Sequence, residues 1–146
     1  MSIPPKLLRV LRSAGAVVLG YAVIVACTSV GFGQLGGIIH MTAPVRIQAA
    51  ATFVAVTSGL LGGIIAALIA GSHPIRHATA VLLFLCIDTG VVLVRGSADP
   101  LWFDLMGAAT LMLATVCGGA VYAVLSKRLG RPLSGSRRKL ESNQRQ

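Results

Sequence analysis

The segment LFLCIDTGVVLVRG, residues 83–96, places one carboxylate, Asp88, inside a stretch that is otherwise apolar. A charged acid inside a bilayer costs roughly 2.5–3.5 kcal/mol on insertion scales. The cost falls when the carboxyl takes up a proton, because burial favours the neutral form of an acid, or when it finds a polar partner. Asp88 therefore has the chemistry of a proton- or cation-binding site, or of a hydrogen-bonded link between helices.

Hydroxyl side chains expected at a similar depth in the neighbouring segments are candidate partners of Asp88. Arg95 follows Asp88 by seven residues and so shares its helix face, two turns further on. The candidate intramembrane polar site combines Asp88 and Arg95 with the hydroxyl-bearing residues Thr28, Ser29, Thr57 and Thr110. Both a structural and a transport interpretation of this set are open.

The histidines and cysteines give weaker signals. In HPIRH, residues 73–77, two histidines stand four apart, but Pro74 suits the first position of a helix, which makes His73 the residue before it. Paired spacing typical of metal or redox motifs is absent among the cysteines, Cys27, Cys86 and Cys117. Nucleotide-binding and nucleophile motifs are also absent. We therefore expect no metal, no cofactor and no enzymatic activity.

The elements that must position these groups are membrane-spanning helices. The 146-residue chain is 55% hydrophobic and 12% charged, with a mean hydropathy of +0.82, whereas soluble domains are about 25% charged. Crossing a bilayer takes roughly 20 apolar residues in a helix. Four runs qualify, at 13–33, 48–70, 75–95 and 103–126, and none alternates as membrane β-strands do. We expect an all-α membrane protein with four transmembrane helices in a compact bundle.

The distribution of charge predicts the orientation of these spans. Of the 13 Lys and Arg residues, only Arg46 and Arg95 fall on the side opposite the termini, where Asp99 and Asp104 also lie in the outer loop. The positive-inside rule then predicts that both termini are cytoplasmic. Residues 1–12 form a basic N-terminal segment.

The start of the first span permits a second interpretation. Basic residues, an apolar stretch and IVAC, residues 24–27, are typical of a lipoprotein signal peptide that is cleaved before Cys27. Cleavage would remove residues 1–26 and leave three spans. The apolar run continues past Cys27, which favours an uncleaved first span.

Small residues in two spans predict close helix packing. Gly59, Gly63, Ala67 and Gly71 recur every four residues in the second span, and Ala114 and Gly118 do so in the fourth. Lipid tails are as apolar as Leu, so membrane helices associate through close approach over small residues. We expect packing within the bundle, with docking against another chain as the alternative.

The tail, residues 127–146, is basic and poor in apolar residues, which predicts disorder beyond Gly130. Basic residues near a membrane surface gain about 1 kcal/mol each from anionic lipid. Nucleic acid is not favoured, because no aromatic platform accompanies the charge. The expected partners are the lipid bilayer, anionic lipid at the tail, and further copies or other membrane subunits.

RVLRSAGAVVLGY, residues 9–21, and GLLGGIIAALIAG, residues 59–71, resemble segments of small bacterial inner-membrane proteins with four spans and no assigned activity. The resemblance implies a fold and a bacterial inner-membrane location, and it transfers no functional residue. Two other four-span families differ, because small multidrug transporters use an acid in the first helix and dimeric fluoride channels have Asn and Phe motifs. We expect a structural or accessory role as a complex subunit. The alternative is a small transporter or channel subunit that uses Asp88.

Overall fold

The computed structural model describes residues 4–37, 39–71, 73–96 and 99–128. It has four helices, α1 (Pro5–Gln34), α2 (Val45–Ala70), α3 (Pro74–Arg95) and α4 (Leu101–Arg128). Each is long and apolar enough to cross a membrane, which confirms the expected all-helical architecture with four membrane-length helices. The segment predicted to be disordered, beyond Gly130, lies entirely outside the described residues, which end at Arg128.

Proline and glycine set most of the helix limits. A proline has no N–H to satisfy and a backbone already suited to the first turn. Accordingly, each helix begins at or directly after a proline, namely Pro5, Pro44, Pro74 and Pro100. Gly71 ends α2 in the left-handed region, with φ of 68°, and Gly96 follows α3 with φ of 83°.

Every helix begins before its predicted span, and α2 begins at Val45 rather than at residue 48 and α3 at Pro74 rather than at residue 75. α1 begins at Pro5 rather than at residue 13, because its basic first turns continue the helix beyond the part apolar enough to predict a span. α4 begins at Leu101 rather than at residue 103. Asp104 therefore lies in the first turn of α4 and not in the outer loop. An acid there is compatible with the helix, since the N-terminal end of a helix favours negative charge.

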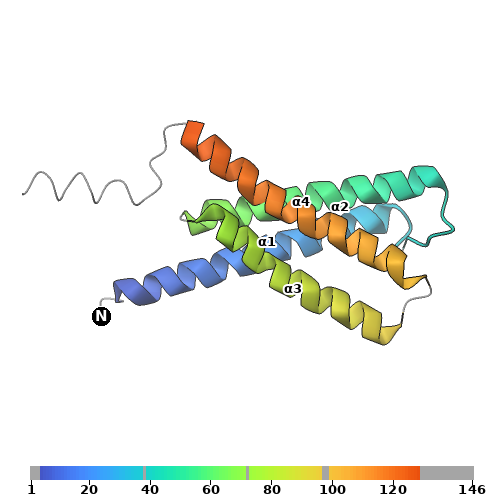
Figure 1. The fold of residues 1–146 in the computed structure, drawn as a ribbon, viewed down its shortest axis with the longest axis horizontal. Coiled ribbons are helices and arrows are strands. Elements are labelled where there is room, and N and C mark those ends of the chain that lie inside the picture. Colours follow the sequence, from blue (N-terminus) through green and yellow to red (C-terminus); the bar gives the residue numbers. More distant parts are fainter. Residues whose placement is uncertain (1–3, 38, 72, 97–98, 129–146) are drawn as a thin grey trace, which may run out of the picture.

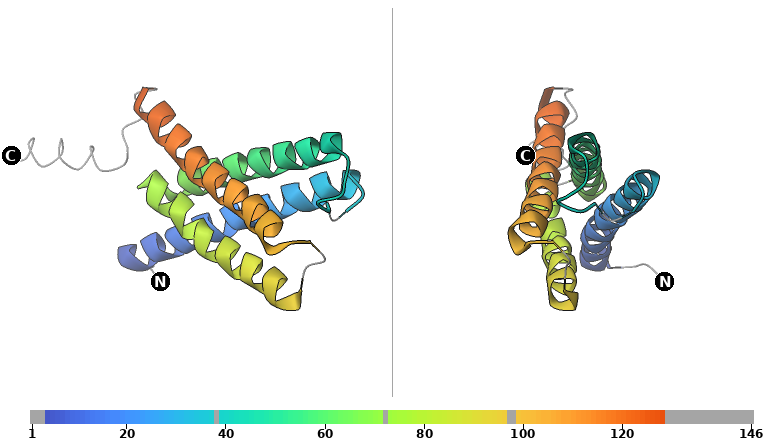
Figure 2. Two further views of the ribbon diagram at one scale, coloured as in Figure 1. Left: turned by 45° about the vertical axis from the view of Figure 1, so that its right-hand side comes forward. Right: turned by 90° about the vertical axis from the view of Figure 1, so that its right-hand side faces the viewer.

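The helices form two layers, α1 with α2 and α3 with α4 (Figures 1 and 2). α2 is central, because it packs against each of the other three helices, whereas no contact joins α1 to α4 among the described residues. The start of α1 and the end of α4 lie at the same end of the bundle (Figure 1). We call this the terminal end and the opposite one the loop end.

Glycines on two faces of α2 allow its neighbours to approach closely. A Cβ atom on Gly59 would lie 2.8 Å from the Cβ of Ala114, and one on Gly63 would meet the backbone of Thr115 in α4. On the other face, a Cβ on Gly62 would meet Ile24 of α1. Both helices thus pack directly against the backbone of α2, as small-residue packing in membranes allows.

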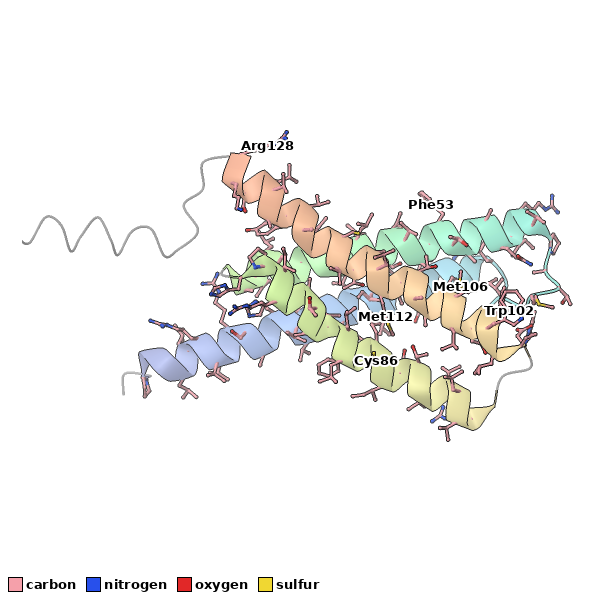
Figure 3. The ribbon with its side chains drawn as sticks, viewed as in Figure 1. Phe53, Cys86, Trp102, Met106, Met112 and Arg128 are labelled. Carbon is pink, nitrogen blue, oxygen red and sulfur yellow. The ribbon has the colours of Figure 1, made fainter. Side chains whose placement is uncertain are left out.

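Larger side chains fill the region where α1, α2 and α3 meet. Ile24, Ala66, Val81 and Leu85 form this core, and each is at most 3% exposed. Outside it, many apolar side chains remain exposed, including Phe53 at 70%, which points away from the bundle (Figure 3). An apolar exterior of this kind is suited to lipid or to another membrane chain.

Candidate functional site

Asp88 lies on the face of α3 that forms the core. Pro74, Ala78, Val81 and Leu85 are buried and recur every three or four residues, which defines one stripe along the helix. The same spacing continues to Asp88, yet Asp88 is exposed. The stripe therefore leaves the packed part of the bundle between Leu85 and Asp88.

The rest of this face is also uncovered toward the loop end. Val92, four residues after Asp88, is 48% exposed, and Arg95 is exposed at the end of α3. We call Asp88, Val92 and Arg95 the open stripe. Phe84, four residues before Asp88 in α3, contacts Tyr21 of α1, with ring centroids 5.4 Å apart. The open stripe thus faces the side on which α1 lies, although α1 does not cover it.

The predicted hydroxyl partners are bonded within their own helices. Thr28 donates to the carbonyl of Ile24, Thr57 to that of Phe53 and Thr110 to that of Met106, each at 2.8 Å. Such bonds satisfy the hydroxyl groups locally. Ser29 is exposed on α1. Within the described part of the chain, no hydrogen bond joins Asp88 to Arg95 or to any of these hydroxyls.

A polar cluster at the loop end was not predicted from the sequence. The Nδ1 atom of His40 lies 2.9 Å from Oδ2 of Asp99, and the Met41 amide donates to Oδ1 of Asp99 at 3.0 Å. Gln48 in turn donates to the carbonyls of Met41 and Ala43, at 2.6 and 3.0 Å. The expected topology places both loops on the same side of the membrane, but only tertiary structure shows that they meet.

The Asp99 carboxylate is held in its charged form. The amide of Met41 is the largest cause and lowers the pKa of Asp99, while partial desolvation opposes it. The hydrogen bond and charge of His40 lower the pKa of Asp99 further. This carboxylate therefore links the loop after α1 to the loop before α4.

The second acid near the loop end is Asp104. Its Oδ2 atom is buried and has no hydrogen-bond partner within the described ranges. Buried polar atoms normally have a partner, so this oxygen is an exception in the fold. The predicted span 103–126 includes Asp104, although the charge distribution assigned this residue to the outer loop, and the burial of its Oδ2 atom was not expected.

HPIRH lies at the terminal end. As expected, His73 precedes α3 and Pro74 begins it, but the His73 side chain does not cap the helix. Instead His77 Nδ1 lies 3.1 Å from the His73 carbonyl oxygen, to which it donates. No group of three or more His, Cys, Asp or Glu residues that could hold a metal occurs in the described segments.

The predicted packing residues differ in their positions. Gly59 and Gly63 lie against α4, next to Ala114 and Thr115 respectively, and a Cβ on Gly118 would meet the backbone of Leu60. Ala67 is fully buried in α2. Gly71 lies beyond the last turn of α2, where a Cβ would meet the guanidinium of Arg12.

Comparison with known proteins identifies no relative of this chain. No family model matches the chain, and neither a curated protein nor a solved structure is detectably similar to it.

Proposed function

We propose that the protein is a structural or accessory subunit of a membrane complex, and that the open stripe of α3 receives a helix of another membrane protein. We place it in a bacterial inner membrane with both termini in the cytoplasm. The observation that carries the proposal is the change in side-chain exposure along one face of α3. Leu85 is only 3% exposed, whereas Asp88, three residues later on the same face, is exposed.

The energetic argument concerns the Asp88 carboxylate. Intramembrane acids generally face a bundle interior or a water-filled cavity, since a charged one facing lipid costs roughly 2.5–3.5 kcal/mol. In this chain Asp88 lies on the inward face of α3 but beyond the core that covers Leu85. A further helix on the open stripe would complete the bundle and shield the carboxylate from lipid.

The chemistry of the stripe favours a different protein over a second copy. A symmetric contact between two open stripes would bring Asp88 of each chain together, because such an interface uses the same patch on both subunits. Two carboxylates at one site disfavour ionisation of both. A partner helix that offers a hydroxyl, amide or basic side chain at this depth avoids that conflict.

The experiment is native mass spectrometry after gentle extraction at natural expression level, combined with site-specific photocrosslinking. A photoreactive residue at Val92, which is 48% exposed on the open stripe, should capture a membrane protein of defined mass. The matched control is Leu105, which is 44% exposed and lies on α4, on the side opposite Ala114. A foreign subunit present in fixed stoichiometry and crosslinked at Val92 alone is the expected result.

The main alternative, a transporter or channel subunit, rests on the same carboxylate. Asp88 has no hydrogen bond within the described residues, and so it retains its capacity to bind a proton or a cation. A homo-oligomer without foreign subunits would reject the accessory role and favour transport. Flux that persists in full in Asp88→Asn would in turn reject transport through Asp88.

A further inference from the structure

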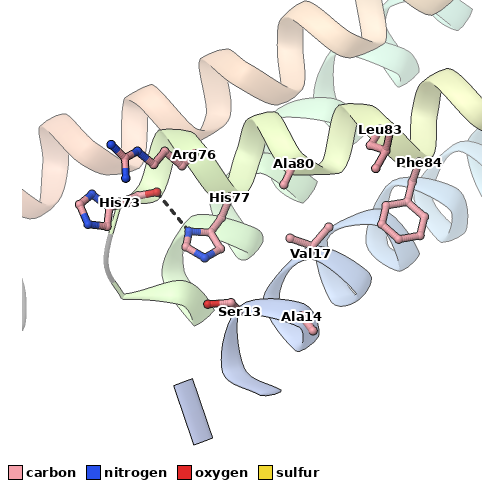
Figure 4. Close-up of a pocket in the computed structure, with 9 residues that line it drawn as sticks. All are labelled: Ser13, Ala14, Val17, His73, Arg76, His77, Ala80, Leu83 and Phe84. Atoms are coloured by element: carbon pink, nitrogen blue, oxygen red, sulfur yellow. Dashed lines mark hydrogen bonds between the residues drawn. The ribbon is translucent and has the colours of Figure 1, made fainter. Parts of the chain in front are cut away.

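A groove of about 570 Å³ lies between the first halves of α1 and α3, at the terminal end of the bundle. Figure 4 shows His73 and Arg76 toward one end of it and Leu83 and Phe84 toward the other. Eleven residues of helix separate His73 from Phe84, which corresponds to about 16 Å. The groove thus runs from the end of the bundle into its membrane-spanning part, and it changes from polar to apolar along its length.

The polar end presents groups that bind anions. Arg76 is exposed there, and the His77 imidazole uses Nδ1 to donate to the His73 carbonyl oxygen. That bond orients the ring, and Nε2 can donate to a bound anion when the imidazole carries a hydrogen on both nitrogens. Ser13 of α1 adds a hydroxyl, and no side chain caps the first amides of α3. Uncapped amides at a helix start add to the attraction for negative charge.

The charge around this end is complementary to an anion. Every lining residue is basic, histidine, hydroxyl-bearing or apolar, and none is acidic. Arg12, next to the lining Ser13, donates from Nε to the carbonyl of Ile69 at 2.6 Å, which holds the start of α1 against the end of α2. The acids Asp99 and Asp104 lie at the loop end. Asp88 lies twelve residues after Arg76 in α3, about 18 Å along the helix, so no described carboxylate is adjacent to Arg76.

The apolar half of the groove argues for a lipid over a free anion. Val17, Ala80, Leu83 and Phe84 line it, and they continue from the polar end into the part of the bundle that would face acyl chains. A soluble phosphate compound would use only the polar end. A phospholipid would place its phosphate there and lay a chain along the apolar side chains.

We propose that this groove binds one anionic phospholipid, with its phosphate at Arg76 and His77 and one acyl chain along Val17, Leu83 and Phe84. Basic pockets between transmembrane helices bind lipid headgroups of this kind. None of the residues that line the groove belongs to the basic tail or to the open stripe.

The test uses the full chain in nanodiscs that contain phosphatidylcholine with or without phosphatidylglycerol, and native mass spectrometry counts the retained lipids. Wild type should retain one phosphatidylglycerol in preference to phosphatidylcholine. Arg76→Gln should weaken that binding about fivefold, as loss of one basic contact implies. Arg46→Gln removes the same charge from the exposed start of α2, at the opposite end of the bundle, and should leave the binding unchanged. The tail is the same in every variant and does not affect the comparison.

Two further variants distinguish a bound phospholipid from a bound soluble anion. Ala80→Trp fills the apolar half and should abolish retention of the lipid, and Arg76→Lys should restore most of the binding. Equal losses in Arg76→Gln and Arg46→Gln, or full retention in Ala80→Trp, would overturn the assignment. Soluble glycerol phosphate that competes as well as the lipid would also overturn it, because the acyl chain would then contribute nothing. Thermal unfolding of each variant identifies any that fail to fold.

Discussion

The His40 imidazole lies 2.9 Å from the Asp99 carboxylate, although the two residues are 59 positions apart in the chain. His40 belongs to the loop between α1 and α2, and Asp99 to the loop between α3 and α4. Asp99 also accepts a hydrogen bond from the amide of Met41. The two loops are thereby joined at the loop end of the bundle.

This cluster predicts a loss of stability in acid. An acid whose pKa is lowered in the folded state stabilises the fold above its ordinary value of about 3.9, and that contribution is lost as the pH falls through the folded value. The pKa of Asp99 is lowered, chiefly by the Met41 amide. The melting temperature in detergent should therefore fall below about pH 4.

Asp99→Asn tests this directly. It should melt at a lower temperature than wild type at pH 7 and show a smaller further decrease in acid. His40→Gln should retain more of the acid dependence than Asp99→Asn does, because it keeps the Met41 amide bond, the larger cause. Identical acid profiles for wild type and Asp99→Asn would contradict the prediction.

The close approach of α2 and α4 makes a second prediction. A Cβ on Gly63 would meet the backbone carbonyl of Thr115. Gly63→Ala should therefore lower the free energy of unfolding by about 1–3 kcal/mol, the usual cost of overpacking. Gly90→Ala is the control, since no atom lies within 4 Å of its Cβ position. It should be neutral or gain up to about 1 kcal/mol from the better helix former. Equal unfolding curves in denaturant for Gly63→Ala and Gly90→Ala would contradict this close packing of α2 against α4.

The sequence predicted the positions of the helices well, but not which side of each helix faces the bundle. Long apolar runs located four spans and Pro74 marked the start of the third, and the structure extends α1 from residue 13 back to Pro5. In a membrane both the packed and the lipid-facing sides of a helix are apolar, so hydrophobicity cannot orient it. That is why the burial of Val81 and Leu85 beside the exposed Asp88 could not be predicted.

The candidate site could be predicted only in part, for a related reason. Residue type and depth singled out Asp88 and its hydroxyl neighbours, but the threonines satisfy their hydroxyl groups on their own helices. The contact between His40 and Asp99 depends on how two loops meet, and no local pattern encodes it. The small residues that recur every four positions in α2 predicted one packing face. The second face, at Gly62, could not be predicted, because the sequence does not show that α2 is the central helix.

A third prediction concerns the bond from Arg12 to the end of α2. Arg12 donates from Nε to the carbonyl of Ile69 at 2.6 Å. The last carbonyls of a helix favour a cation by about 0.3–1 kcal/mol. Arg12→Gln should therefore lower the free energy of unfolding by about 0.3–1 kcal/mol. Arg9→Gln, which removes the same charge one turn earlier, should have no measurable effect in denaturant unfolding. Equal losses in both variants would attribute the effect to net charge.

The last prediction separates the stability of the isolated chain from its association with a partner. Because Asp88 is exposed in the single chain, Asp88→Leu should change the free energy of unfolding of the purified protein by less than about 0.5 kcal/mol, as exposed substitutions usually do. The same variant should lose the foreign subunit in native mass spectrometry, because a partner's polar group would then be left unpaired. Asp88→Asn keeps the size and the hydrogen-bonding capacity and should retain it. A partner that binds Asp88→Leu as well as wild type would contradict the proposal that the open stripe is the contact surface.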